Sequence, residues 1–118
     1  MSLVKVSQAE GRVPVTVFEL QDRVNLGNTA ELEQAAKDAY ANGTRDLVID
    51  ISKVDSFTSA GIRALLVIYK LLAADEGKKS KHVKLVSPTP YVREVLEVSG
   101  VADSVEIHDT LEEAVASF

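Results

Sequence analysis

The sequence predicts a single α/β domain over residues 1–118, with a mixed sheet of four to five strands packed with about four helices. Three observations lead to this fold class. The 118 residues are one domain by length and enough to bury a core. Two valine-rich segments near the start flank turn residues, which predicts a hairpin. Short apolar segments then alternate with helical patterns, which predicts parallel strands joined by helices.

The hairpin and one helix are expected in the first part of the chain. Residues 3–7 and 14–20 read as strands, and residues 9–12 supply the turn between them. A helix should follow a polar connector, with Asn28 as its N-cap and Glu31 completing a capping box. Its apolar residues recur at helical spacing and Gly43 should end it: Leu32, Ala35, Ala36 and Tyr40.

The later elements alternate between strand and helix. The segment DLVIDI, residues 46–51, is a nearly continuous apolar run, as expected for a strand buried on both faces of a parallel sheet. Two helices have clear start signals, with Thr89 capping a helix that has Pro90 first, and Thr110 forming a capping box with Glu113. The further expected elements are a helix over about 59–75 stopping at Gly77, strands over 82–86 and 105–107, and a helix end at Gly100.

Composition excludes several classes of function. A net charge of -5 argues against nucleic acid, which requires a basic face. The one lysine cluster, Lys78, Lys79, Lys81 and Lys84, is interpreted as a solvated loop. There is no cysteine, hence no thiolate metal site. We see no signal peptide and no apolar run of the roughly 20 residues that a membrane span needs. We therefore expect a cytoplasmic protein without direct membrane insertion.

The residues that catalysis requires are missing. The two histidines are His82, at the start of an expected strand, and His108, beside Asp109 at a strand end; we interpret both as surface or cap residues. The six glycines are dispersed, so no phosphate-binding loop or dinucleotide fingerprint exists. We expect no enzyme activity, no cofactor and no metal.

The helix expected from residue 59 carries two apolar stripes. One is the inward face, made by Ile62, Leu65, Leu66, Tyr69, Leu72 and Ala73. The second is Ala64, Val67, Ile68 and Leu71. Either another part of the chain covers this second stripe or it is a surface for a partner.

The start of this helix is its most informative part. Thr58 and Ser59 are both good N-cap residues, yet one cap needs one hydroxyl. Gly61 in a first turn costs roughly 0.5–1 kcal/mol relative to alanine. No acid lies in this turn to compensate the helix dipole, and Arg63 stands there instead. Because open α/β sheets place functional loops after the carboxyl ends of strands, these residues predict a docking or modification site without catalysis.

The segment LVIDISKVDSFTSAGIRALL, residues 47–66, resembles the signature of STAS domains, in particular the bacterial anti-sigma factor antagonists. The likeness extends to LQDRVNLGNTAEL, residues 20–32, and to the C-terminal half from residue 83 to residue 115. Two departures stand out. Thr58 occupies a position where the family often has aspartate, and Asp22-Arg23-Val24-Asn25 replaces its Gly-x-Leu-Asp segment.

This resemblance implies an anti-sigma factor antagonist that is switched by phosphorylation. The acceptor would be Ser59, with Thr58 as the alternative. The implied partners are an anti-sigma factor that is also a serine protein kinase, bound by the unphosphorylated form, and a metal-dependent protein phosphatase that resets the switch. A monomer is expected. The partner-binding surface implied is Asn25, Asp55, Phe57, Thr58, Ser59, Ala60, Gly61 and Arg63.

A different class of function stays open from the sequence. The alternative is a non-switching STAS module that acts as a scaffold subunit or as the cytoplasmic partner of a transporter or sensor complex. The second apolar stripe would then be a permanent interface, and a stable oligomer in solution would favour this reading over the switch.

Overall fold

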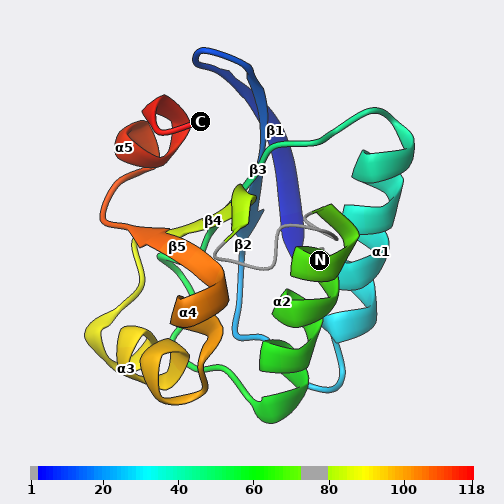
Figure 1. Ribbon diagram of the computed structural model, residues 1–118. Coiled ribbons are helices and arrows are strands. Elements are labelled where there is room, and N and C mark those ends of the chain that lie inside the picture. The colour runs from blue at the N-terminus through cyan, green and yellow to red at the C-terminus, as the bar shows by residue number, and fades with distance from the viewer. Residues whose placement is uncertain (1–2, 73–79) are drawn as a thin grey trace.

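The computed structural model describes residues 3–72 and 80–118, which form one mixed five-stranded sheet (Figure 1). The strands lie in the order β1-β2-β3-β4-β5. β1 and β2 pair antiparallel as a hairpin, and β2 to β5 are parallel. Their bounds are β1 Val4–Glu10, β2 Pro14–Leu20, β3 Leu47–Asp50, β4 Ser80–Val86 and β5 Val105–His108.

The helices cover the two faces of the sheet unequally. Four helices pack on the main core on one face, and α5 contacts β3, β4 and β5 across the other face (Figure 1). Their bounds are α1 Thr29–Ala41, α2 Ser59–Leu72, α3 Pro90–Val98, α4 Val101–Ser104 and α5 Leu111–Ala116. The loops after β2, β3 and β4 therefore start at the carboxyl ends of these parallel strands and lead into α1, α2 and α3.

Alternation along the strands divides the side chains between the two cores. In β2, Phe18 faces the main core with α1 and α2, and Val17 faces the smaller core with α5. In β3, Ile49 and Val48 divide in the same way. This is the period of two that a strand imposes, and it confirms that the DLVIDI segment is buried on both faces.

The predicted single α/β domain with its mixed sheet is confirmed, and the strand and helix bounds shift by a few residues. β1 continues to Glu10, so the predicted turn over residues 9–12 begins too early. β4 begins at Ser80 rather than at residue 82. The short helix α4 was not predicted; it follows Gly100, whose φ of 89° is the left-handed conformation that glycine favours. The predicted end of α2 near residues 75–77 lies outside the described residues.

Two of the three predicted helix caps are confirmed. The Thr89 hydroxyl accepts a hydrogen bond from the Val92 amide, and the Thr110 hydroxyl accepts one from the Glu113 amide, each at 3.2 Å. The capping box of α1 is wrong, because Asn28 makes no side-chain cap hydrogen bond.

The side chains of that capping box have other partners. The Asn28 side-chain oxygen accepts from the Asn25 amide, and its nitrogen donates to the Arg23 carbonyl. Glu31 instead accepts from the Val4 amide, at 3.1 Å. Tertiary and loop contacts thus outcompete the local cap, which is worth about 1 kcal/mol.

The second apolar stripe of α2 is covered in part by the chain itself. Ala64 and Ile68 are buried, and Val67 and Leu71 are half-buried. α2 lies between α1 and α4 on the sheet, so these helices flank it on both sides (Figure 1). Of the two alternatives left open for this stripe, the structure therefore favours cover by the chain itself at Ala64 and Ile68, while Val67 and Leu71 stay partly exposed.

Lys84 also departs from its expected place in a solvated loop. It lies within β4 with only 2% of its area exposed, and its ammonium group contacts the Ser117 hydroxyl, the Phe118 ring and the Glu106 carboxylate. Lys78 and Lys79 lie outside the described residues.

Candidate functional site

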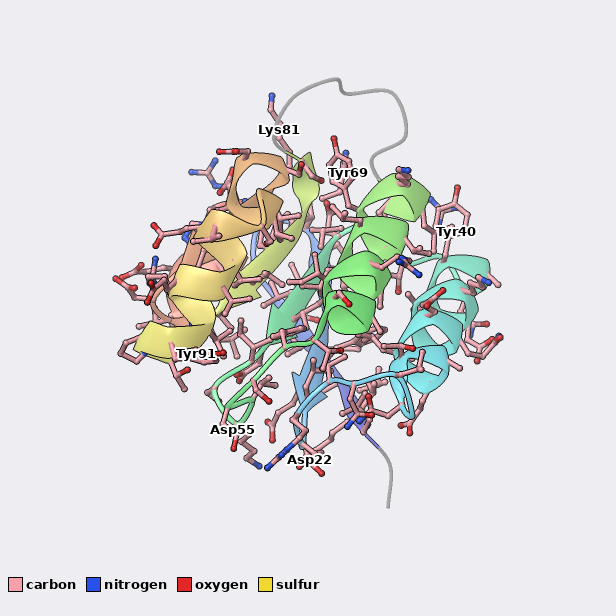
Figure 2. All side chains as sticks on the ribbon, turned by 90° about the horizontal axis from the view of Figure 1, so that it is seen from below. Asp22, Tyr40, Asp55, Tyr69, Lys81 and Tyr91 are labelled. Atoms are coloured by element: carbon pink, nitrogen blue, oxygen red, sulfur yellow. The ribbon has the colours of Figure 1, made fainter. Side chains whose placement is uncertain are left out.

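The start of α2 lies where two loops meet at the carboxyl end of the sheet. The loop after β3 leads into α2, and the loop after β2 runs beside it. Val24 and Phe57 form an isolated parallel bridge between the two loops. Figure 2 shows Asp22 and Asp55, one from each loop, at the same end of the molecule. The two sequence segments singled out above, 20–32 and 47–66, are therefore neighbours in space.

Thr58 is the N-cap of α2. Its hydroxyl oxygen accepts a hydrogen bond from the Gly61 amide at 3.3 Å, and its carbonyl accepts one from the Ile62 amide at 3.0 Å. The same hydroxyl donates to the Val24 carbonyl at 3.4 Å, and the Thr58 amide donates to that carbonyl at 3.3 Å. Thr58 therefore caps the helix and ties it to the neighbouring loop.

Ser59 has a different place, at the first residue of α2. Its side chain is exposed, and its hydroxyl makes no hydrogen bond to any residue in ranges 3–72 and 80–118. The sequence left the choice of cap open between the two hydroxyls. The structure assigns the cap to Thr58 and leaves the Ser59 hydroxyl accessible to other molecules.

Position 61 holds glycine because other residues of the chain lie too close to it for a side chain to fit. An added Cβ would lie 2.8 Å from Cδ1 of Phe57, 3.0 Å from Cγ1 of Val24 and 3.2 Å from the Val24 carbonyl oxygen. Gly61 and Phe57 are both buried. These two expected contact residues therefore support the site from beneath, and a partner in this conformation would meet the side chains around them.

The charges around the helix start leave it positive. α2 has no acidic residue in its first turn, and Arg63 is exposed there. The nearest acid of the same loop, Asp55, forms an exposed ion pair with Arg23 of the neighbouring loop at 3.7 Å. The partial positive charge of the amide ends is thus not neutralised by a first-turn carboxylate, which favours an anionic group at this position.

A second ion pair joins the loop after β3 to the end of β2. The Lys53 ammonium lies 3.0 Å from the Glu19 carboxylate. The hydrogen bond from Gln21 and the contact with Lys53 lower the pKa of Glu19 below its ordinary value. Glu19 is therefore ionised at neutral pH and holds the loop after β3 against the end of β2.

The loop after β2 presents one apolar side chain that the sequence analysis missed. The Asn25 side-chain oxygen accepts from the Gly27 amide at 2.8 Å, which closes a tight turn around Leu26. Leu26 is 83% exposed. A single leucine within a polar connector was the signal available in the sequence. Asn25 itself is half-buried, so its main role in this structure is to shape the turn.

The expected site residues thus fall into two groups. The exposed or half-exposed members, which share one surface at the start of α2, are Asn25, Asp55, Thr58, Ser59, Ala60 and Arg63. Phe57 and Gly61 lie under that surface. The surface has an accessible hydroxyl and a positive helix end, and no side chain of the described residues is hydrogen-bonded to that hydroxyl.

The groups that could serve catalysis lie elsewhere. His82 pairs with Asp46 at 2.9 Å, and His108 pairs with Glu106 at 2.9 Å, both on β-strands or their ends and away from α2. Within residues 3–72 and 80–118 there is no cluster of three potential metal ligands. The same ranges contain no helix with the length and apolar character to cross a membrane.

Comparison with known proteins gives consistent results. Residues 7–114 match the family described as STAS domain. The "Putative anti-sigma factor antagonist BtrV" of Bordetella bronchiseptica is 33% identical over 99 residues, which cover 84% of this chain and 82% of that protein.

Two solved structures share the fold. The crystal structure of an anti-sigma factor antagonist from Mycobacterium paratuberculosis has a TM-score of 0.81 and 24% identity, covering 97% of this chain and 91% of that one. The phosphorylated form of the Bacillus cell fate determinant SpoIIAA has a TM-score of 0.67 and 19% identity, covering 95% and 96%.

Proposed function

The chain belongs to the STAS domain family of anti-sigma factor antagonists, and we propose that it is a phosphorylation switch with Ser59 as the acceptor. In this proposal the unphosphorylated chain binds an anti-sigma factor that is also a serine kinase, and so frees a sigma factor. Phosphorylation of Ser59 ends that binding. A metal-dependent phosphatase restores the first state. The cycle would take place in the cytoplasm.

The choice of Ser59 rests on a difference in hydrogen bonding between two adjacent hydroxyls. The Thr58 hydroxyl is engaged with the Gly61 amide and the Val24 carbonyl. A kinase acting on Thr58 would have to break both contacts and uncap α2, at a cost of about 1 kcal/mol for the cap alone. The exposed Ser59 hydroxyl can be reached without such a loss.

The physical chemistry of the helix start supports a switch that leaves the fold intact. A phosphate adds about -1.5 to -2 charges at neutral pH. At the first residue of α2 this charge meets the positive helix end and no acidic neighbour in the first turn. The domain should therefore tolerate the phosphate well.

An interface that buries Ser59 would not tolerate it. Moving a dianion out of water is costly unless the partner supplies matching cations and hydrogen bonds. Ala60 follows Ser59 directly, and Leu26 is exposed on the neighbouring loop; in this proposal both contact the partner and lose those apolar contacts when it is displaced. The switch thus acts through association.

The chain itself needs no catalytic residue in this scheme, because the kinase and the phosphatase supply the chemistry. The positive charges of Arg63 and of the helix end would stabilise the negative charge of the phosphate.

The test is to incubate the purified chain with Mg-ATP and the anti-sigma serine kinase of its own organism. Intact-mass spectrometry should show one added phosphate, and size-exclusion chromatography should show that the phosphorylated chain no longer joins the kinase. Ser59→Ala should bind the kinase and take up no phosphate. Thr58→Ala is the matched control, because it removes the neighbouring hydroxyl and should still be phosphorylated.

Two results would contradict the proposal. Stoichiometric phosphate on Ser59→Ala would make Thr58 the acceptor. A stable complex that forms without any phosphate transfer would favour the non-switching scaffold or transporter partner. That alternative stays a prediction, and its expected interface is reduced because Ala64 and Ile68 of the second stripe are buried.

A further inference from the structure

β1 is an edge strand whose outer side is open. It pairs with β2 on one side, and its residues 5–8 and Glu10 are exposed. No other described strand pairs with its outer side. An exposed edge of this length is a template for a further strand unless the protein blocks it.

The hydrogen bonds show which residues of β1 point outward. In an antiparallel pair, a residue directs both its amide and its carbonyl to the same side, and this side alternates along the strand. The Leu3 carbonyl accepts from Gln21, so odd-numbered residues face β2. The Val4 amide donates to Glu31 of α1, so even-numbered residues face outward. Val6, Gln8 and Glu10 therefore present their backbone groups at the open edge.

We propose that a second copy of this chain pairs antiparallel along this edge, with Gln8 opposite Gln8 and Val6 opposite Glu10. This register is symmetric, as a two-fold dimer requires. It uses the three outward-facing residues of each copy. It also leaves the hydrogen bond between Val4 and Glu31 in place, because in this register Val4 lies beyond the paired segment.

The side chains at this edge favour a second copy as the occupant. Val6 is 53% exposed, although β-branched side chains gain stability from cross-strand contacts. Beside it lies a groove of about 490 Å³ between the hairpin and the end of α1, lined by Val6, Gln8, Asn42 and Arg45 among others. Residues opposite each other across a strand pair share a face of the sheet. Glu10 of the second copy would therefore cover Val6 and enter this groove.

Charge complementarity sets the pair of residues to test. Arg45 is exposed and held in position by hydrogen bonds to the carbonyls of Tyr40 and Thr44, at 2.9 and 2.7 Å, and by stacking on the Tyr40 ring. Glu10 is exposed and forms no ion pair with the described residues. In the proposed register the Glu10 carboxylate of one copy meets the guanidinium of Arg45 in the other.

This interface is independent of the proposed switch. Gln8 lies toward the hairpin turn, whereas the start of α2 lies at the carboxyl end of β3 (Figure 1). Pairing through β1 leaves Ser59 open in both copies. The sequence led us to expect a monomer, whereas this proposal predicts a reversible dimer of small interface.

The experiment is sedimentation velocity over a range of concentrations, with the wild-type chain and three charge variants. The wild type should shift from monomer toward dimer as its concentration rises to several hundred micromolar. A dissociation constant in that range corresponds to an association free energy of about 5 kcal/mol. Glu10→Lys and Arg45→Glu should each raise the dissociation constant at least about tenfold. The double variant Glu10→Lys with Arg45→Glu should restore dimerisation.

Lys5→Glu is the control, because Lys5 lies on the other face of β1 and its change should leave the dimer intact. Circular dichroism verifies that each variant is folded. A wild type that stays monomeric throughout the concentration range overturns the proposal. So does a dimer that both single variants preserve, or a double variant that fails to restore it.

Discussion

Replacing Gly61 by alanine is the most direct test of how the start of α2 is built. The added methyl group would stand 2.8 Å from the Phe57 ring and 3.0 Å from the Val24 side chain. Neither neighbour can move freely, since Phe57 is 8% exposed and Val24 is fully buried. The Val24 carbonyl, 3.2 Å away, also accepts hydrogen bonds from Thr58. The substitution should therefore strain the contact between the two loops.

The expected size of the effect follows from two opposing terms. Overpacking a filled core costs about 1–3 kcal/mol. Alanine in place of glycine returns roughly 0.5–1 kcal/mol through the lower entropy of the unfolded chain. The net result is a loss of about 1–2 kcal/mol in the free energy of unfolding. Such a loss lowers the melting temperature of a domain of this size by several degrees, about 4 °C or more per kcal/mol.

The assay is equilibrium unfolding in urea, followed by circular dichroism. With a slope of about 2 kcal/mol per molar, the midpoint of Gly61→Ala should fall by about 0.5–1 M. Gly27→Ala is the matched control, because its added Cβ would approach only the Asn25 side-chain oxygen, at 3.2 Å. If Gly61→Ala unfolds at the same or a higher urea concentration than the wild type, the Phe57 ring and the loop around Val24 can move aside without loss of stability. Our explanation of Gly61 would then be wrong.

Three further outcomes are expected. Thr58→Ala should lower the free energy of unfolding by about 1 kcal/mol in urea unfolding, whereas Thr58→Ser should keep most of it, and equal losses would contradict the capping role. Glu106→Gln should destabilise by about 2 kcal/mol at pH 7, because Lys84 stays buried with one partner fewer. Burial acts to raise the pKa of Glu106, but hydrogen bonds and charges of His108 and Lys84 outweigh it and lower the pKa below 4.5. The contribution of the Glu106 charge is therefore present above about pH 4.5 and lost as the pH falls through the lowered pKa, so acid titration of both chains should show their difference narrowing. Arg23→Ala should change thermal stability by less than about 0.5 kcal/mol, since its pair with Asp55 is exposed, and a larger loss would reveal a structural role.

Local signals in the sequence predicted most of the fold. The nearly continuous apolar run of DLVIDI predicted a strand buried on both faces, and β3 has that form. The caps at Thr89 and Thr110 were predicted because each partner amide lies three residues further along the same helix. The cap at Asn28 failed because a loop contact and the Val4 amide engaged Asn28 and Glu31 instead.

The candidate site could be located from the sequence but not resolved into roles. The run of Thr58, Ser59, Ala60 and Gly61 after a buried strand indicated where the site lies. The lack of an acidic residue in the first turn of the helix indicated that this helix start is positive. Leu26 could have been noticed as a lone leucine in a polar loop. Nothing local distinguished the two hydroxyls, because both residue types are good N-caps.

The sequence by itself thus determined the α/β class, the order of the strands and helices apart from α4, and the position of the candidate site, because strand alternation, helical spacing and caps act between near neighbours. Tertiary structure decided the rest. Val24, 34 residues before Thr58, selects Thr58 as the cap and requires glycine at residue 61. The contacts with Ser117, Phe118 and Glu106 allow Lys84 to be buried. Such contacts join residues distant in the chain, so they exist only once the sheet has brought those residues together.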